Sequence, residues 1–109
     1  MVRQGDVIFV NFSPQSGHEQ AGRRPALVVS NNTFNEKTGM TIVCPITTTN
    51  NGFPLHVPLE GTETIQGVVM CEHVKALDIA ARGYEVADRV PENFLARIVR
   101  LVTLEIQIK

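Results

Sequence analysis

The chain has no tryptophan, and its 109 residues include only two cysteines, three histidines and one tyrosine. Cys44 and Cys71 lie inside apolar runs without ligand-like spacing, so we expect two buried thiols rather than a disulfide framework. The histidines are scattered and never fall in a metal-binding spacing. The sequence therefore predicts no structural or catalytic metal and no cofactor.

A strong charge of either sign is also absent. Ten basic and eleven acidic side chains leave a formal net charge of −1. This balance argues against indiscriminate coating of nucleic acid, which requires a broad basic surface. It still allows a small nucleic-acid site built from a few arginines in a cleft, because the local potential matters more there than the total charge.

Long apolar runs are lacking, and the longest is far too short to span a membrane. The chain does not open with a basic and then apolar leader, so we expect a cytoplasmic protein without a membrane partner. Hydrophobic residues make up 43% and charged residues 19% of the chain. This composition predicts one globular domain over residues 1–109.

Short apolar runs separated by turn residues predict an α+β domain that is mainly β. We expect strands at 7–12, 26–30 and 41–46, an edge strand at 55–59, and one bent strand or two successive strands over 67–71 and 73–79. Polar residues 31–37, closed by Gly39, predict a short helical turn. Residues 91–108 predict a terminal helix with Pro91 in its first turn. The pattern favours a small, strongly bent antiparallel barrel with a C-terminal helix.

The predicted terminal helix is apolar over more than the single stripe needed to pack on one sheet. Its apolar positions are Phe94, Leu95, Ile98, Val99, Leu101, Val102, Leu104, Ile106 and Ile108. A face of this width can serve both a core and a partner subunit, so we expect a homodimer.

The most informative segment is the polar loop that leads into the strand at 26–30. It reads GHEQAGRRP over residues 17–25. Pro25 pushes Arg24 toward an extended conformation, so Arg23 and Arg24 point to opposite sides and only one of them faces the same cleft as Glu19. A guanidinium suits bidentate contact with phosphate, although a solvated arginine pair explains the sequence equally well.

Two further groups of polar residues follow apolar strands. Thr47, Thr48 and Thr49 end the third strand, where threonines either satisfy turn backbone or bind a ligand. Glu72 interrupts an apolar stretch, which is unusual for a carboxylate that is neither paired nor functional. Strand alternation then directs His73 to the opposite side, as a core or interface histidine.

The edge-strand region adds two aromatic rings. His56 alternates with Leu55 and Val57, which favours a solvent-facing position. Phe53 follows Asn50, Asn51 and Gly52 in the sequence. Its ring either stacks on a nucleic-acid base or folds back under its own loop.

Three segments together resemble the MazF/PemK toxin family: GHEQAGRRPALVVS at 17–30, FNEKTGMTIVCPIT at 34–47 and GVVMCEHVKALDIAARG at 67–83. The similarity is collinear from Gly5 to Gly83. It implies an SH3-like barrel that forms a homodimer and acts as a metal-independent endoribonuclease. Such toxins cut single-stranded RNA, mainly mRNA, at short sequences and arrest translation. The resemblance also implies a cognate antitoxin whose acidic, disordered tail folds over the cleft.

The resemblance also assigns roles to residues of the candidate site. Arg24 would stabilise the charge of the transition state, and Thr47 would position the phosphate. Glu19 would act as a base or orient Arg24, and His18 would assist at the phosphate.

The sequence departs from the PemK-type pattern at two positions. Glu72 keeps a carboxylate of that pattern with one more methylene, whereas Met70 stands where PemK-type members have an arginine. Methionine cannot donate a proton, so we expect this chain to depend on Arg24 and Thr47. Base readout depends on the loops at 15–23 and 48–54, from which we expect RNA contacts by Gln20, Arg23, Thr48 and Phe53.

Two other functions belong to different classes. The barrel resembles the CcdB toxins, which poison DNA gyrase through a tryptophan near the C-terminal end, but this chain has no tryptophan and ends in Ile108-Lys109. A non-catalytic RNA-binding barrel is the other alternative, and Met70 is the residue that favours it.

Overall fold

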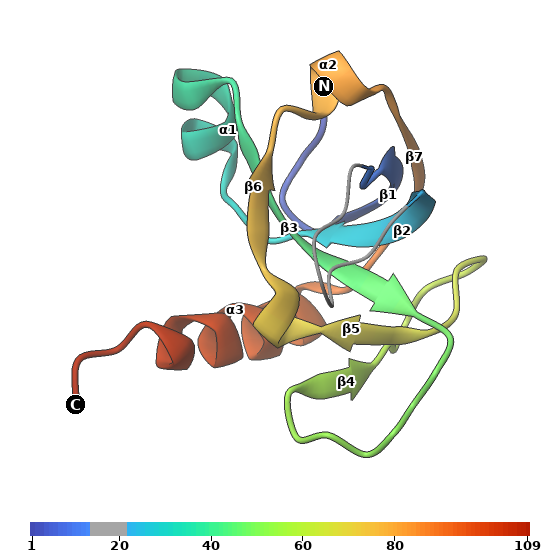
Figure 1. Cartoon of the computed structure of the whole chain (residues 1–109), viewed down its shortest axis with the longest axis vertical. Coiled ribbons are helices and arrows are strands. Elements are labelled where there is room, and N and C mark those ends of the chain that lie inside the picture. Colours follow the sequence, from blue (N-terminus) through green and yellow to red (C-terminus); the bar gives the residue numbers. More distant parts are fainter. Residues whose placement is uncertain (14–21) are drawn as a thin grey trace.

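The computed structural model describes residues 1–13 and 22–109. Its elements are β1 (Asp6–Asn11), β2 (Arg23–Val28), α1 (Asn32–Thr38), β3 (Thr41–Thr47), β4 (His56–Pro58), β5 (Val68–Met70), the 3-10 turn η1 (Cys71–His73), β6 (Lys75–Leu77), α2 (Ile79–Arg82), β7 (Tyr84–Arg89) and α3 (Glu92–Glu105). The chain is therefore mainly β with a C-terminal helix, as predicted (Figure 1).

The strands form one curled antiparallel sheet in the order β4-β5-β3-β2-β1-β7, and β6 pairs with β3 beside β5. In Figure 1 the chain from β6 through α2 to β7 arches over β1 and β2. Within the described part of the chain no strand pairing joins β6 to β7, so the barrel is not closed by a continuous ladder. β3 connects the two halves, because it pairs with β2 on one edge and with β5 and β6 on the other.

The central strands are apolar on both faces because each face covers a separate core. One core, which we call the helix-side core, includes Phe94 and Ile98 of α3 packed against Val7, Leu27, Cys44, Ile46 and Val69. The other, the inner core, lies inside the curl and includes Ile8, Val10, Phe12, Ala26, Val28, Val43 and Leu77. Odd and even positions of β1 and β2 thus alternate between the two cores.

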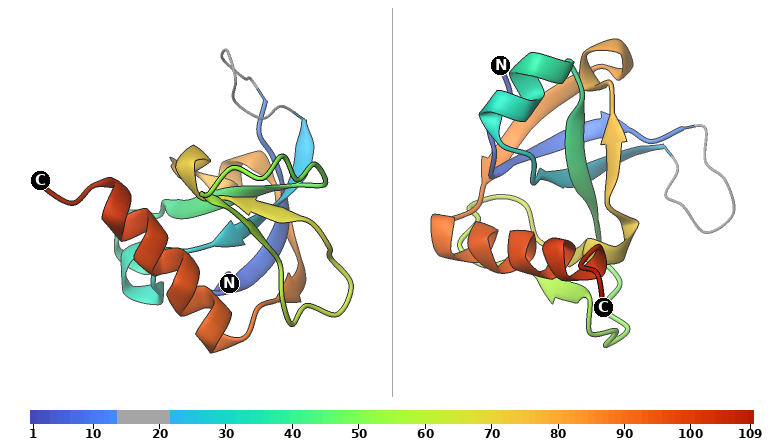
Figure 2. Two further views of the ribbon diagram at one scale, coloured as in Figure 1. Left: turned by 90° about the horizontal axis from the view of Figure 1, so that it is seen from below. Right: turned by 90° about the vertical axis from the view of Figure 1, so that its left-hand side faces the viewer.

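The helix α3 lies along one side of the sheet, and the chain's C-terminus points away from the body (Figure 2). It spans Glu92–Glu105, so the predicted range 91–108 is too long at both ends. Pro91 is the N-cap instead of a residue of the first turn. Ile106 and Ile108 follow the helix and are largely exposed. None of the helices in residues 1–13 and 22–109 has the length and apolar character that crossing a membrane requires.

The predicted short helix at 31–37 is confirmed as α1. The Asn31 side chain accepts a hydrogen bond from the Phe34 N–H at 2.8 Å, and Gly39 ends the helix with a left-handed φ of 71°. The segment after residue 67 forms two successive strands, β5 and β6, separated by η1. Sequence reasoning missed α2 and β7.

Both cysteines are buried and free, as predicted. Burial raises the pKa of Cys44 far above its usual range, and it raises the pKa of Cys71 to about 12. Both thiols therefore stay protonated and serve as packing groups of the helix-side core.

Candidate active site

Arg24 and Thr47 lie on adjacent strands. β2 and β3 pair antiparallel with Ala26 opposite Pro45, and continuing this register by two residues sets Arg24 opposite Thr47. Directly opposed residues of an antiparallel pair project from the same face of the sheet. Arg24 has the parity of Ala26 and Val28, so this is the face of the inner core. The register thus brings the two predicted positions side by side.

Arg23 is engaged on the other side of β2. Its guanidinium lies 5.7 Å from the ring centroid of Phe9, and its Nη2 lies 3.4 Å from Glu85 Oε1. The side chains of Arg23 and Glu85 are both more than half exposed, so this ion pair contributes little to stability. The contacts hold Arg23 against β1 and β7 at the surface.

The three threonines at the end of β3 and just after it differ in their contacts. Thr47 Oγ1 accepts a hydrogen bond from the Thr49 N–H at 3.2 Å, which satisfies the turn backbone as the structural interpretation of this motif predicts. A hydroxyl that accepts one bond keeps its own hydrogen for donation, so this contact leaves Thr47 able to bind a phosphate oxygen. Thr47 is half-buried, whereas Thr48 is exposed beside it.

Lys75 is a residue that sequence reasoning missed. It lies on β6 opposite Val43, whose side chain belongs to the inner core, so Lys75 projects from the same face as Arg24. Its Nζ lies 5.8 Å from the ring centroid of Phe12. Strand alternation through residues 75–77 is the signal that could have identified this second cation.

The described residues on either side of 14–21 are joined by a set of contacts that we call the loop clamp. The Phe12 N–H donates to the Gly22 carbonyl at 2.8 Å, and the Gly22 N–H donates to Ser13 Oγ at 3.0 Å. Arg82 Nη1 donates to the carbonyls of Asn11 and Ser13, both at 2.9 Å. The predicted site residues His18, Glu19 and Gln20 fall within this loop and lie outside the described residues.

Glu72 is paired with His56. The distance from His56 Nε2 to Glu72 Oε2 is 2.6 Å, and the His56 side chain is only 9% exposed. The predicted solvent-facing position of His56 is therefore wrong. Strand alternation in the sequence gives no sign of the contact between His56 and the Glu72 carboxylate of η1. The prediction that His73 faces away from Glu72 is also wrong. The 3-10 turn breaks strand alternation, and His73 Nε2 lies 3.9 Å from the same oxygen.

Phe53 covers the His56 ring. Their ring centroids lie 5.2 Å apart at an interplanar angle of 82°, an edge-to-face contact. Phe53 is nevertheless 44% exposed, so its ring is neither folded under the loop nor free of the protein. One side of the ring contacts His56, and the remainder is accessible for stacking.

The pair lies close to the C-terminal end of α3. Burial raises the pKa of Glu105, and the nearby Glu72 carboxylate raises it further. After the larger effect of burial, Glu105 and Glu72 also raise the pKa of both cysteine thiols. The two carboxylates and the two thiols are therefore close enough to interact electrostatically. Among residues 1–13 and 22–109, no group of three His, Cys, Asp or Glu side chains is arranged to hold a metal ion.

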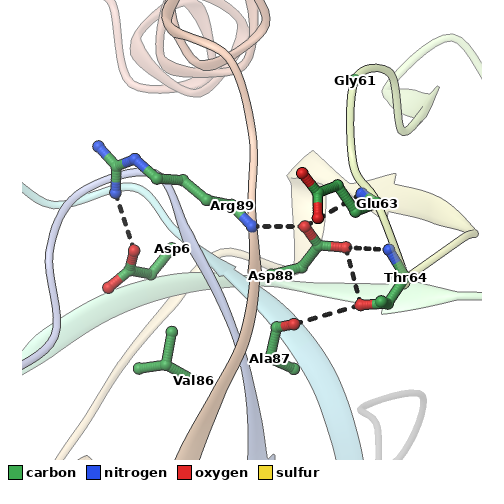
Figure 3. Close-up of a pocket in the computed structure, with 8 residues that line it drawn as sticks. All are labelled: Asp6, Gly61, Glu63, Thr64, Val86, Ala87, Asp88 and Arg89. Carbon is green, nitrogen blue, oxygen red and sulfur yellow. Dashed lines mark hydrogen bonds and ion pairs between the residues drawn. The ribbon is translucent and has the colours of Figure 1, made fainter.

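A cavity of about 480 Å³ lies elsewhere, between β7 and the segment that joins β4 to β5 (Figure 3). None of the predicted site residues lines it. Arg89 and Asp88 point to opposite sides of β7 there: Arg89 Nη1 donates to Asp6 Oδ1 at 2.8 Å, and Asp88 accepts backbone hydrogen bonds from residues 63–65. Asp6, Asp88 and Arg89 are thus already bonded within the protein, which favours a structural role for this cavity.

Comparison with known proteins gives consistent matches over almost the whole chain. The family of PemK-like, MazF-like toxins of type II toxin-antitoxin systems matches residues 3–105. The endoribonuclease toxin MazF of Escherichia coli K12 is 47% identical over 79 residues, covering 72% of this chain and 70% of that protein. The endoribonuclease toxin ChpB of the same strain is 43% identical over 111 residues, covering 91% and 92%.

A solved structure matches the fold equally well. The crystal structure of MazF from Deinococcus radiodurans superposes with a TM-score of 0.90 at 36% identity, covering 98% of this chain and 97% of that one. MazF in a MazE–MazF complex from the same organism gives a TM-score of 0.82 at 36% identity, covering 97% of each chain.

Proposed function

Because the chain belongs to the PemK-like, MazF-like toxins of type II toxin-antitoxin systems, we propose that it cuts single-stranded RNA with the RNA's own 2′-OH as nucleophile. Its relatives MazF, PemK and ChpB are endoribonucleases, and this chain is an endoribonuclease toxin of the same kind. Cleavage of mRNA by such an enzyme arrests translation. We assign the activity to the cytoplasm, where mRNA is present.

The reaction is a transesterification. The 2′-oxygen loses its proton to a base and bonds to the adjacent phosphorus, while the bond from phosphorus to the 5′-oxygen breaks. The 5′-oxygen keeps the electron pair of that bond and takes up a proton from an acid or from water. The products are a 2′,3′-cyclic phosphate and a 5′-OH end, and no metal ion is needed because RNA supplies the nucleophile.

The observation that carries this proposal is the register of β2 and β3, with Ala26 opposite Pro45, which when continued by two residues puts Arg24 and Thr47 on one face. A guanidinium is always charged and can donate two parallel hydrogen bonds to phosphate oxygens, so Arg24 is suited to the charge that develops on the phosphorane. Thr47 would donate its hydroxyl hydrogen to the same phosphate. Lys75 on this face would add to the attraction of the RNA backbone.

The remaining roles follow the family pattern. Glu72 would accept the proton of the 2′-OH, with Glu19 and His18 assisting from the loop. Gln20, Arg23, Thr48 and Phe53 would contact the RNA around the cleaved bond. The 44% exposure of Phe53 supports a stacking role for its ring.

Two protein partners complete the proposal. Solved relatives include MazE–MazF complexes, and we propose a cognate antitoxin whose acidic tail occupies the cleft in place of RNA. We also propose a homodimer. Leu104, Ile106 and Ile108 are 44%, 79% and 97% exposed at the end of α3 and beyond it, an apolar surface suited to a partner subunit.

A digest of a long single-stranded RNA in EDTA tests the proposed chemistry. The expected result is cleavage that leaves 5′-OH and cyclic phosphate ends, while a DNA of the same sequence stays intact because it lacks the 2′-OH. A requirement for added Mg²⁺ would overturn the mechanism. RNA that is bound but never cut would instead identify a non-catalytic barrel.

A further inference from the structure

His56 makes the shortest described contact of the Glu72 carboxylate. Its Nε2 lies 2.6 Å from Glu72 Oε2, within hydrogen-bonding distance, whereas His73 Nε2 lies 3.9 Å from that oxygen, which is beyond it. A carboxylate only accepts, so His56 Nε2 carries the hydrogen and donates it. A donor that is 91% buried and fixed in place determines where the carboxylate points.

The position of His56 is fixed by the backbone on both sides. It pairs with Met70 in the β4–β5 ladder, and the Cys71 N–H donates to the Leu55 carbonyl at 3.0 Å. The His56 N–H donates to the Phe53 carbonyl at 2.9 Å, which closes the turn that presents the Phe53 ring. The imidazole is thus held between a strand, a closed turn and an aromatic ring.

That turn is itself prefolded by short side chains. Asn50 Oδ1 accepts from the Gly52 N–H at 3.0 Å, and Asn51 Oδ1 accepts from the Phe53 N–H at 3.1 Å. These local bonds reduce the number of conformations available to the segment before His56. The backbone that leads into His56 is therefore already ordered before its side chain bonds to Glu72.

The two oxygens of the Glu72 carboxylate differ in their surroundings. Oε2 takes the hydrogen bond from His56, whereas Oε1 is buried and has no hydrogen-bond partner among the residues that the structure describes. The Glu72 side chain as a whole keeps 28% of its surface exposed. The contact with His56 is therefore the described hydrogen bond that sets the orientation of this carboxylate.

We propose that His56 is the positioning residue of Glu72: its Nε2–H fixes the orientation of the carboxylate that takes the proton of the ribose 2′-OH. This inference rests on the proposed function, in which Glu72 accepts that proton. His56 transfers no proton itself and does not contact the RNA. Met70, its partner in the ladder, has no side-chain donor, so the orienting hydrogen bond comes from β4 instead of β5.

Kinetics of RNA cleavage by variants test the inference. We expect His56→Ala to lower kcat about 100-fold, the effect of misplacing a reacting group by about 1 Å, with KM changed less than about threefold. His56→Gln keeps an N–H donor of similar reach and should recover most of that loss. His73→Ala removes the other histidine beside Glu72 and is the matched control, with kcat close to that of the wild type.

A double variant separates positioning from a general effect on the fold. Glu72→Gln should lower kcat about 100-fold or more, and adding His56→Ala to it should lower kcat no further, because His56 acts only through Glu72. Additive losses would overturn the inference. Equal kcat values for His56→Ala and the wild type would overturn it too. Circular dichroism and Tm check that each variant is folded.

A spectroscopic measurement is independent of activity. Nitrogen NMR of the wild-type protein should show His56 protonated at Nε2, and Glu72→Gln should shift the Nε2 signal while that of His73 changes less. A His56 ring without a hydrogen on Nε2 would overturn the inference. A wild-type protein that cuts no RNA would overturn the proposed function and this role with it, whereas normal cutting by His56→Ala overturns this role alone.

Discussion

Asp88 Oδ2 on β7 accepts a hydrogen bond from the backbone N–H of Thr64 at 2.6 Å, which ties the connection between β4 and β5 to the far edge of the sheet. The same carboxylate accepts from the N–H groups of Ile65 at 2.8 Å and Glu63 at 3.2 Å. Partial burial opposes ionisation, but the backbone N–H groups of Ile65, Thr64, Arg89 and Glu63 hold the pKa of Asp88 well below its usual range. One side chain thus organises a segment that contains no regular structure.

The first prediction concerns this carboxylate. Asp88→Ala should lower the free energy of unfolding at pH 7 by about 2 kcal/mol, because several backbone donors lose their acceptor. The contribution of a carboxylate with a lowered pKa is complete above its ordinary value of about 3.9 and is lost as the pH falls below it. Urea unfolding at pH 7 and pH 3 should therefore show a smaller difference between the two proteins in acid.

Asp88→Asn is the control for charge, since it keeps the shape and one carbonyl acceptor. It should be less destabilising than Asp88→Ala, and its stability relative to the wild type should improve in acid. A constant difference between wild type and both variants from pH 7 to pH 3 would contradict the role given to the ionised group.

The second prediction concerns Gly61, in the same connection. Its φ is +78°, and a Cβ built there would overlap the Pro91 ring, lying 2.7 Å from Cδ. Gly61→Ala should therefore cost the strain of a left-handed alanine, about 1 kcal/mol, plus the displacement of Pro91 from the start of α3. Thermal unfolding of the variant should show a clear fall in Tm.

Gly52→Ala is the control that measures backbone strain without a steric overlap, so the difference between the two variants gives the steric part. Gly52 has nearly the same φ, +79°, with no atom of the described residues within 4 Å of its added Cβ. The fall in Tm should be distinctly larger for Gly61→Ala than for Gly52→Ala. Equal effects would mean that backbone strain alone explains both.

The third prediction concerns Arg24. Arg24→Ala should abolish RNA cutting, because it removes the cation opposite Thr47, while the exposed position of the side chain leaves the fold intact. Arg23→Ala is the matched comparison and should weaken RNA binding without abolishing cutting, since Arg23 lies against Phe9 and Glu85 on the other side of β2. A gel assay of RNA cleavage measures both. Undiminished cutting by Arg24→Ala would remove it from the site.

Much of the fold was predictable because β1, β2, β3 and α3 contribute alternating or helical apolar patterns to two cores. β7 was not, because none of its residues is fully buried and charged residues such as Glu85 and Asp88 interrupt any apolar pattern. Its place in the sheet depends on pairing with β1, a contact between distant segments that local sequence does not encode.

Part of the candidate site was also predictable from the sequence. The opposition of Arg24 and Thr47 follows from strand register once β2 and β3 are identified. The burial of His56 could not be predicted, because it depends on a 3-10 turn that redirects Glu72 and on a closed turn that brings Phe53 over the ring. Both are short-range departures from strand alternation.

The loop clamp has an evolutionary consequence. Phe12, Ser13, Gly22 and Arg82 close the base of the 14–21 segment with contacts that do not depend on what the segment contains. Insertions and substitutions between Ser13 and Gly22 would leave these contacts in place. Related chains that keep the clamp can therefore differ between Ser13 and Gly22 while the strands that carry the clamp stay the same.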